Sequence, residues 1–168
     1  GSSNAAIGIH TAMRDSTPMV AFVGHVNSKS MSRESFQEID QHAFFGSVAK
    51  EVLSPKNTDD IARVTAEAVR LSTDGRPGPV VVQIPRDVSS MDTNMPIPAP
   101  TARKPHLPDA RLVDRAITMI DAASAPLVVA GEMISNQDAV EALTKFTEKA
   151  GMPIMSAYRR LDVMANSH

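Results

Sequence analysis

The side chains with the clearest chemical potential lie in a polar stretch around residue 30 and in the segment that follows it. Gln37 stands between Phe36 and Glu38, so an amide lies beside an aromatic ring and a carboxylate. An amide N–H in such a place could donate a hydrogen bond to a carbonyl or to a developing oxyanion. The alternative is a solvated first helical turn, whose acidic side chains the helix dipole favours. The local sequence leaves both interpretations open.

His25 is the histidine that merits attention, because it lies in the same polar stretch, directly after an apolar run. The five histidines of the chain show no metal-ligand spacing. The chain has no cysteine, which excludes disulfides and thiolate chemistry. Because α/β folds keep binding sites in polar loops after parallel strands, His25 is either a pocket residue or a solvated loop residue.

Residues 1–87 alternate helical and strand patterns, which predicts an α/β fold with parallel sheets flanked by helices. The apolar run at 80–84, between a Gly/Pro turn and Pro85, has little polar alternation, as in a strand buried on both faces. We expect helices at 4–14, with Asn4 as N-cap, at 36–45 and at 58–73. The expected strands are 19–23, 48–53 and 80–84.

Residues 88–108 differ in composition, with five prolines in the last 13 positions, and predict a semi-rigid linker. A second unit follows at 109–168, with helices at 109–120 and 136–150 and strands near 127–130 and 153–155. Gly131 after the first of these strands invites a nucleotide-binding interpretation. The G-x-G-x-x-G pattern is missing and Glu132 would repel phosphate, which favours a plain turn. The predicted architecture is therefore two incomplete three-layer units joined by a proline-rich linker.

Composition excludes several function classes. The net charge of −2 gives no large basic surface, so no nucleic-acid partner is expected. No run of 18 apolar residues is present, so no membrane span is expected. The chain shows no secretory signal pattern, which makes the cytoplasm the expected location.

Five segments, in this order, resemble the thiamine-diphosphate-dependent enzymes of the acetolactate synthase type. They are Gly-Ser-Ser-Asn at 1–4, Asp-Ser-Thr-Pro-Met-Val at 15–20, Gly-His-Val at 24–26, Phe-Gln-Glu-Ile-Asp at 36–40 and Gly-Arg-Pro-Gly-Pro-Val at 75–80. The part up to residue 87 resembles the latter half of that family's pyrimidine-binding domain. Residues 88–108 resemble its linker, and residues 109–168 resemble the first half of its central, Rossmann-like domain.

The resemblance implies roles for five residues. Asn4 and Ser3 resemble the cofactor-binding turn near the aminopyrimidine. Gln37 resembles a catalytic glutamine beside the reacting centre, and Phe36 resembles a wall of the substrate pocket. His25 stands where many relatives have glutamine, and the resemblance places it in the same pocket. It assigns no metal ligand in this chain.

The implied activity is decarboxylation of a 2-oxo acid and ligation of the remaining unit to a second carbonyl, as a lyase or transferase. The implied cofactors are thiamine diphosphate and Mg²⁺, with FAD or ADP as an option in the central domain. The implied partners are a small 2-oxo acid and further copies of the protein, in a dimer or tetramer.

Two requirements of that chemistry have no candidate in these residues. They are the family's glutamate that protonates the pyrimidine ring, and its Gly-Asp-Gly stretch with a downstream Asn that holds magnesium and diphosphate. We therefore expect a fragment without turnover of its own. The alternative is a non-catalytic α/β nucleotide-binding or interaction module. Convergence of segments 1–4 and 36–38 on one cleft would favour the enzyme.

Overall fold

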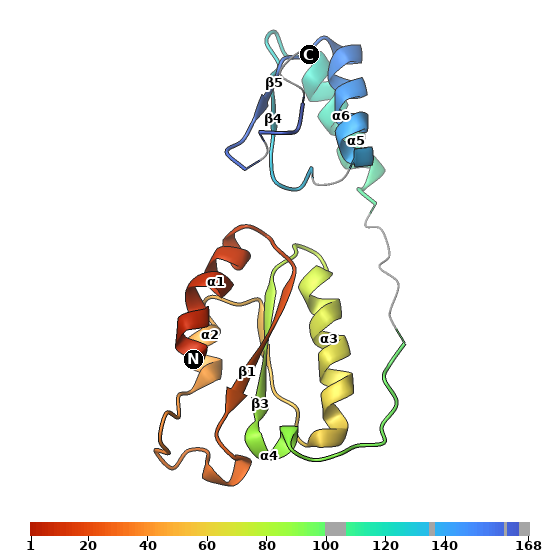
Figure 1. Cartoon of the computed structure of the whole chain (residues 1–168). Coiled ribbons are helices and arrows are strands. Elements are labelled where there is room, and N and C mark those ends of the chain that lie inside the picture. Colours follow the sequence, from red (N-terminus) through yellow and green to blue (C-terminus); the bar gives the residue numbers. More distant parts are fainter. Residues whose placement is uncertain (100–106, 135–136, 160, 165–168) are drawn as a thin grey trace. The chain divides into compact units, whose positions relative to one another are not determined.

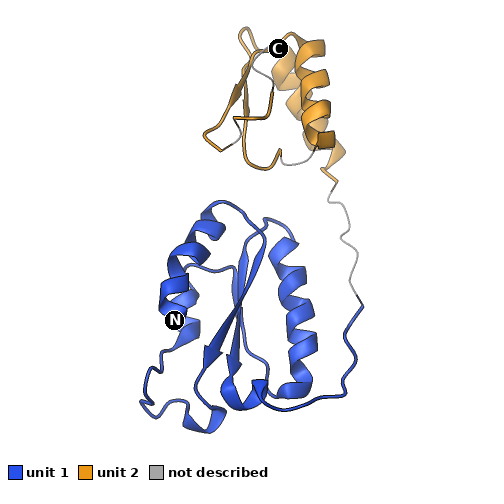
Figure 2. Ribbon diagram, in the orientation of Figure 1, with its two compact units in different colours: residues 1–105 blue, residues 106–168 orange. Residues whose placement is uncertain are grey.

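The computed structural model describes residues 1–99, 107–134, 137–159 and 161–164. The chain divides into two compact units, residues 1–105 and 106–168 (Figure 2). Each unit contains a small parallel sheet with helices packed beside it (Figure 1), which confirms the predicted fold class. Of the predicted linker, residues 91–99 form no helix or strand, and residues 100–106 lie outside the described residues.

The first unit alternates helices and strands along the chain. The α-helices are α1 (Ser2–Arg14), α2 (Gln41–Phe45), α3 (Ile61–Thr73) and α4 (Arg86–Ser89). The strands are β1 (Met19–His25), β2 (Glu51–Leu53) and β3 (Pro79–Pro85), and two 3-10 turns are η1 (Ser28–Ser30) and η2 (Thr58–Asp60).

β3 is the central strand, parallel to β1 on one side and to β2 on the other. Its side chains alternate between the two faces of the sheet, as strand geometry requires. Val81 packs in the cluster with Ile9 of α1 and Phe45 of α2. Val80 and Val82 pack in the cluster with α3. Figure 1 shows α1 and α2 on one side of the sheet and α3 on the other, so the prediction of a strand buried on both faces is confirmed.

Three predicted details of the first unit were wrong. α1 begins at Ser2 with Gly1 as N-cap, and the Asn4 amide already donates to the Gly1 carbonyl, so Asn4 is inside the helix. α2 begins only at Gln41, because the Asp40 side chain caps it by accepting from the backbone N–H of Ala43. The second strand shortens from 48–53 to 51–53, because residues before it form turns.

The N-terminal ends of the three strands are tied together by two basic side chains. Lys50 Nζ donates to three backbone carbonyls at the end of α3 and in the following turn, those of Leu71, Asp74 and Arg76. Arg76 Nε donates to Ser16 Oγ at 2.8 Å, and its Nη2 donates to the Arg14 carbonyl at 3.3 Å. We call this region, residues 14–18, Lys50 and 71–78, the anchored end.

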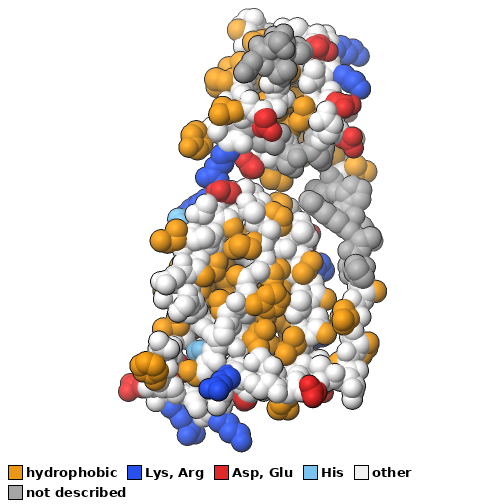
Figure 3. Space-filling model, in the orientation of Figure 1, with side chains coloured by type: hydrophobic (Ala, Val, Ile, Leu, Met, Phe, Trp, Pro, Cys, Tyr) orange, Lys and Arg blue, Asp and Glu red, His pale blue; other side chains and the backbone are white. Residues whose placement is uncertain are grey.

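One edge of the sheet is apolar and open in the described part of the chain. β1 is an edge strand there, and Phe22 keeps 54% of its surface exposed. Figure 3 shows hydrophobic side chains gathered over the middle of the first unit, where β1 runs in Figure 1. None of the described helices combines the length and the apolar character that crossing a membrane requires.

The second unit contains α5 (Ala110–Asp121), β4 (Val128–Ala130), α6 (Gln137–Ala150) and β5 (Ile154–Ser156), with β4 parallel to β5. Asp109 caps α5 as predicted, because its Oδ1 accepts from the backbone N–H of Arg111 at 2.9 Å. The expected first residue of the next helix, Asn136, lies outside the described residues.

Candidate functional site

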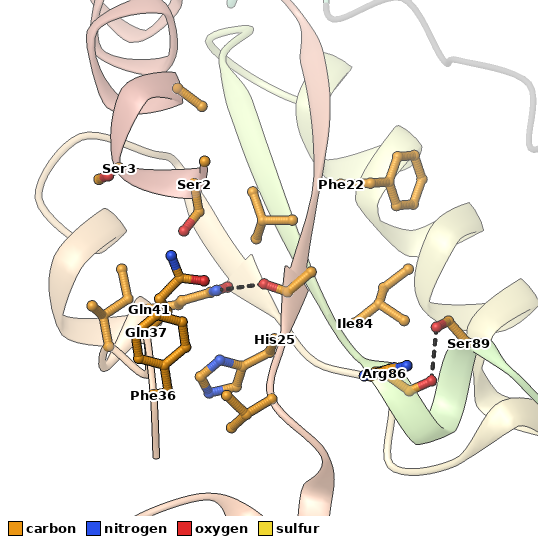
Figure 4. A pocket seen from close by; sticks show the side chains of 16 residues that line it. Ser2, Ser3, Phe22, His25, Phe36, Gln37, Gln41, Ile84, Arg86 and Ser89 are labelled. Atoms are coloured by element: carbon orange, nitrogen blue, oxygen red, sulfur yellow. Dashed lines mark hydrogen bonds between the residues drawn. The ribbon is translucent and has the colours of Figure 1, made fainter. Parts of the chain in front are cut away.

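A cleft of about 970 Å³ opens at the C-terminal ends of β1 and β3. Its walls come from the beginning of α1, the last residues of β1 and β3, the segment from β1 to the first residue of α2, and α4 (Figure 4). In parallel α/β sheets this end is where ligands bind, and the volume is that of a small-molecule or cofactor site. We call residues 1–3, 24–41 and 84–89 the cleft end.

Four of the five predicted site residues line this cleft: Ser3, His25, Phe36 and Gln37. The fifth, Asn4, is exposed in the first turn of α1 and is not among the lining residues. Figure 4 shows Ser2, Ser3, Phe36 and Gln37 on one side of β1, and Ile84, Arg86 and Ser89 on the other. The structure therefore brings segments 1–3 and 36–37 to one cleft, while the role of each residue stays a prediction.

The segment that carries Phe36 and Gln37 has an unusual backbone. Of the four non-glycine residues with positive φ in the described chain, three lie here: Ser32 at 61°, Glu34 at 54° and Gln37 at 62°. A left-handed conformation costs about 1–2 kcal/mol for each such residue. The loop therefore depends on contacts that hold it.

Glu38 supplies two of those contacts. Its Oε1 accepts from the backbone N–H of Ser32 at 2.5 Å, and its Oε2 accepts from that of Ser35 at 2.9 Å. These hydrogen bonds, with Ser35 contributing most, lower the pKa of Glu38 below its usual value, because they favour the charged carboxylate. Ser35 Oγ also donates to the Ser30 carbonyl at 2.7 Å.

Asp87, just after the neighbouring strand β3, holds the beginning of the same segment. Its Oδ1 accepts from the backbone N–H of Ser28 at 2.9 Å and from Ser28 Oγ at 3.1 Å. The backbone N–H of Ser28 is the largest cause that lowers the pKa of Asp87. Two carboxylates thus fix the segment between β1 and α2.

Gln41 is a cleft residue that sequence reasoning missed. It is only 2% exposed, and its Nε2 donates to the Gly24 carbonyl at 2.8 Å. This contact fixes the orientation of the Gln41 amide, because two acceptor oxygens would repel each other. Oε1 is buried and has no hydrogen-bond partner among the described residues. Such an acceptor costs about 1–3 kcal/mol unless a ligand or water satisfies it.

The alternative nucleotide site at Gly131 gains no support from the described residues. After β4, the Ile134 N–H donates to the Gly131 carbonyl at 3.1 Å in a turn, and α6 is described only from Gln137. This hydrogen bond agrees with the plain turn that the sequence favoured. Within the described ranges, no group of three or more acidic, His or Cys side chains could hold a metal ion.

Comparison with known proteins gives the same family for both units. Residues 1–44 match the model of the "Thiamine pyrophosphate enzyme, N-terminal TPP binding domain", and residues 113–168 match that of the "Thiamine pyrophosphate enzyme, central domain".

The curated relatives named here are acetolactate synthases. The chain is 34% identical to the large subunit of Corynebacterium glutamicum and 31% identical to that of Lactococcus lactis, over its full length in both cases. It is 31% identical over 93% of its length to the chloroplastic acetolactate synthase 2 of Nicotiana tabacum. The chain spans 28%, 30% and 24% of these relatives, respectively.

Proposed function

We propose that this chain, which belongs to the thiamine pyrophosphate enzymes, forms part of a thiamine-diphosphate-dependent carboligase of the acetolactate synthase type. The two family matches lie in different units, and the relatives named above share one activity in their names. Because the chain spans less than a third of their length, activity, substrate and partners are proposals about the intact protein that contains it.

The observation that carries this proposal is the convergence at the cleft end. Segments 1–3 and 36–37 are far apart in sequence, and both line one cleft at the C-terminal ends of parallel strands. A non-catalytic module would not require segments 1–3 and 36–37 to meet there. This geometry therefore favours the enzyme over the interaction module.

The cleft has properties that fit the organic part of thiamine diphosphate. Its lining mixes apolar walls with polar side chains, and the unpartnered Gln41 oxygen is an acceptor for an amino or hydroxyl donor. Ser2, Ser3 and Gln41 would hold that part of the cofactor. When bound, thiamine diphosphate supplies a nucleophilic carbon that allows a 2-oxo acid to lose carbon dioxide.

The residues of this chain would orient the reactants. Phe36 lines the cleft and would offer an apolar wall to the substrate, because little of its surface is covered by other residues of this chain. The Gln37 amide would donate a hydrogen bond to the substrate carbonyl and strengthen it as negative charge develops on oxygen. His25 lines the same pocket and would contact the substrate.

The first test is 2-oxo acid consumption by the intact protein with thiamine diphosphate and Mg²⁺, across a panel that begins with pyruvate. We expect Gln37→Ala to lower kcat/KM by about 10²–10³-fold. Gln137→Ala on α6 is the matched control, because Gln137 lies outside this cleft, and it should leave kcat/KM unchanged. No cofactor-dependent turnover on any 2-oxo acid would contradict the proposal.

The 168-residue chain alone should show no turnover in the same assay, because it represents under a third of the length of its relatives. Three further proposals concern the intact protein. It binds Mg²⁺, its second unit binds FAD or ADP, and it forms a dimer or tetramer. Flavin absorbance and the mass in solution test the last two. The cytoplasmic location stays a prediction.

A further inference from the structure

The loop of residues 31–38 presents Phe36 and Gln37 to the cleft without a core of its own. Among its residues, Ser32, Arg33, Glu34, Phe36 and Gln37 are exposed. Three of its residues have left-handed backbone, which L-amino acids rarely adopt. Neither burial nor intrinsic preference therefore accounts for its shape.

A single carboxylate spans this loop. Glu38 accepts from the backbone N–H of Ser32, six residues before it, and from that of Ser35, three residues before it. Ser32 is itself one of the left-handed residues, so the contact lies where the backbone needs support. Beyond Glu38, the Asp40 cap fixes the start of α2. Glu38 thus closes the loop, and Asp40 fixes the helix that follows it.

We propose that Glu38 is a positioning residue, whose ionised carboxylate holds residues 31–38 in the conformation that brings Phe36 and Gln37 to the cleft. Both oxygens act as acceptors, and only a carboxylate offers two. A glutamine at this position would direct an N–H₂ group at one of the two backbone donors. The hydrogen-bonded loop is a property of this chain, and its catalytic consequence rests on the proposed function.

The chain provides a matched comparison in Glu34. Glu34 is in the same loop, is exposed, and makes no hydrogen bond or ion pair among the described residues. It is not a lining residue of the cleft. Glu34→Gln and Glu38→Gln therefore change the net charge equally, and only the second removes a contact that closes the loop.

The loop itself is tested by amide hydrogen exchange, measured by NMR on the 168-residue chain. We expect Glu38→Gln to increase the exchange rates of the Ser32 and Ser35 amides about tenfold or more, because hydrogen bonds to charged groups are the stronger class. Glu34→Gln should change them less than twofold. Unchanged amide shifts in α3 and β3, which belong to the same unit as the loop, verify that each variant is folded. Equal exchange in the two variants would overturn the proposal.

The catalytic consequence is tested in the intact protein. We expect Glu38→Gln to lower kcat about 10–100-fold, since displacement of a catalytic group by about 1 Å has effects of that size. Glu38→Asp, which keeps the charge, should recover part of the loss, and Glu34→Gln should match the wild type. A wild type without thiamine-dependent turnover would refute the proposed function and leave the exchange result valid. An active wild type with unchanged kcat in Glu38→Gln would refute the positioning role.

Discussion

The two ends of the first sheet satisfy their backbone groups in opposite ways. At the anchored end, the cations Lys50 and Arg76 donate to backbone carbonyls that connect α1, α3 and β3. At the cleft end, the carboxylates Glu38 and Asp87 accept from backbone N–H groups of one exposed segment. The anchored end joins helices and strands to each other, while the cleft end fixes only a loop.

The difference shows where this fold places stability and where it places function. Among the described residues, the cleft end holds three of the four non-glycine residues with left-handed backbone, and the anchored end holds the fourth, Ser16. Strain and unsatisfied polar groups concentrate at functional sites, where the surrounding structure maintains them. We therefore expect substitutions at the anchored end to change the free energy of unfolding. Substitutions of cleft-end side chains that line the cleft or hold its loop should change activity.

The largest effect on stability is expected for Lys50→Met. It removes three hydrogen bonds to carbonyls, and hydrogen bonds to charged groups contribute about 1.5–3 kcal/mol each to stability. Because the lysine is half-buried and the contacts are not additive, we expect a loss of about 3 kcal/mol in the free energy of unfolding. Urea unfolding followed by circular dichroism measures it, with the exposed Lys145→Met as control. A loss no greater than that of the control would argue against the anchored end.

Asp87→Asn should produce the reverse pattern. It weakens the contacts to Ser28 that fix the start of the loop, while the buried clusters around β3 stay intact. We expect kcat/KM of the intact protein to fall about 5–20-fold, because the loop that carries Gln37 shifts. The urea midpoint should hardly move. A large shift in midpoint with normal kcat/KM would reverse the assignment of the two ends.

Acid should release the cleft end selectively. The pKa values of Glu38 and Asp87 are both lowered in the folded chain. Their ionised carboxylates therefore stabilise the folded loop fully above their ordinary unfolded pKa values. This stabilisation is lost as the pH falls through the folded values, below about pH 4. The electrostatic effect of His25 also lowers the pKa of Glu38, as the smallest of its causes. The amide shifts of Ser28, Ser32 and Ser35 should change together there, before those of residues 71–78. Simultaneous changes would contradict the comparison.

The smallest effect is expected for Ser32→Gly. Glycine accepts the positive φ without steric cost but loses more entropy on folding, so we expect a net gain of about 0.5 kcal/mol. Ser35→Gly is the matched control, because that residue is not left-handed and its hydroxyl bonds the Ser30 carbonyl. It should destabilise the chain. Thermal unfolding of both variants gives the comparison.

Sequence patterns predicted the framework because local chemistry determines it. The apolar run at 80–84 identified the central strand, and Asp109 was identified as a helix cap from its type and place. The loop between β1 and α2 was not predictable in the same way, since Asp87 reaches Ser28 across 59 residues. The spacing of Phe36, Ile39 and Phe44 suggested a helix from 36, and the Asp40 cap overrides it.

The sequence predicted those site residues that lie in segments resembling the family. Ser3, His25, Phe36 and Gln37 reach the cleft because parallel strands bring their C-terminal ends to one edge. Asn4 fails to reach it because α1 begins two residues earlier than expected. Gln41 could have been noticed as an amide on the buried face of a short apolar helix.

The cleft end supports catalysis, and the anchored end stabilises the folded chain. One paired measurement tests this division directly. The intact protein, Gln37→Ala and Lys50→Met are compared for thiamine-dependent kcat/KM on pyruvate, or on another 2-oxo acid it accepts, and for urea unfolding. We expect Gln37→Ala to lose about 10²-fold or more in kcat/KM with an unchanged unfolding midpoint. Lys50→Met should lose stability and keep kcat/KM within about threefold where it is folded. Equal losses of activity and stability in both variants would contradict the account.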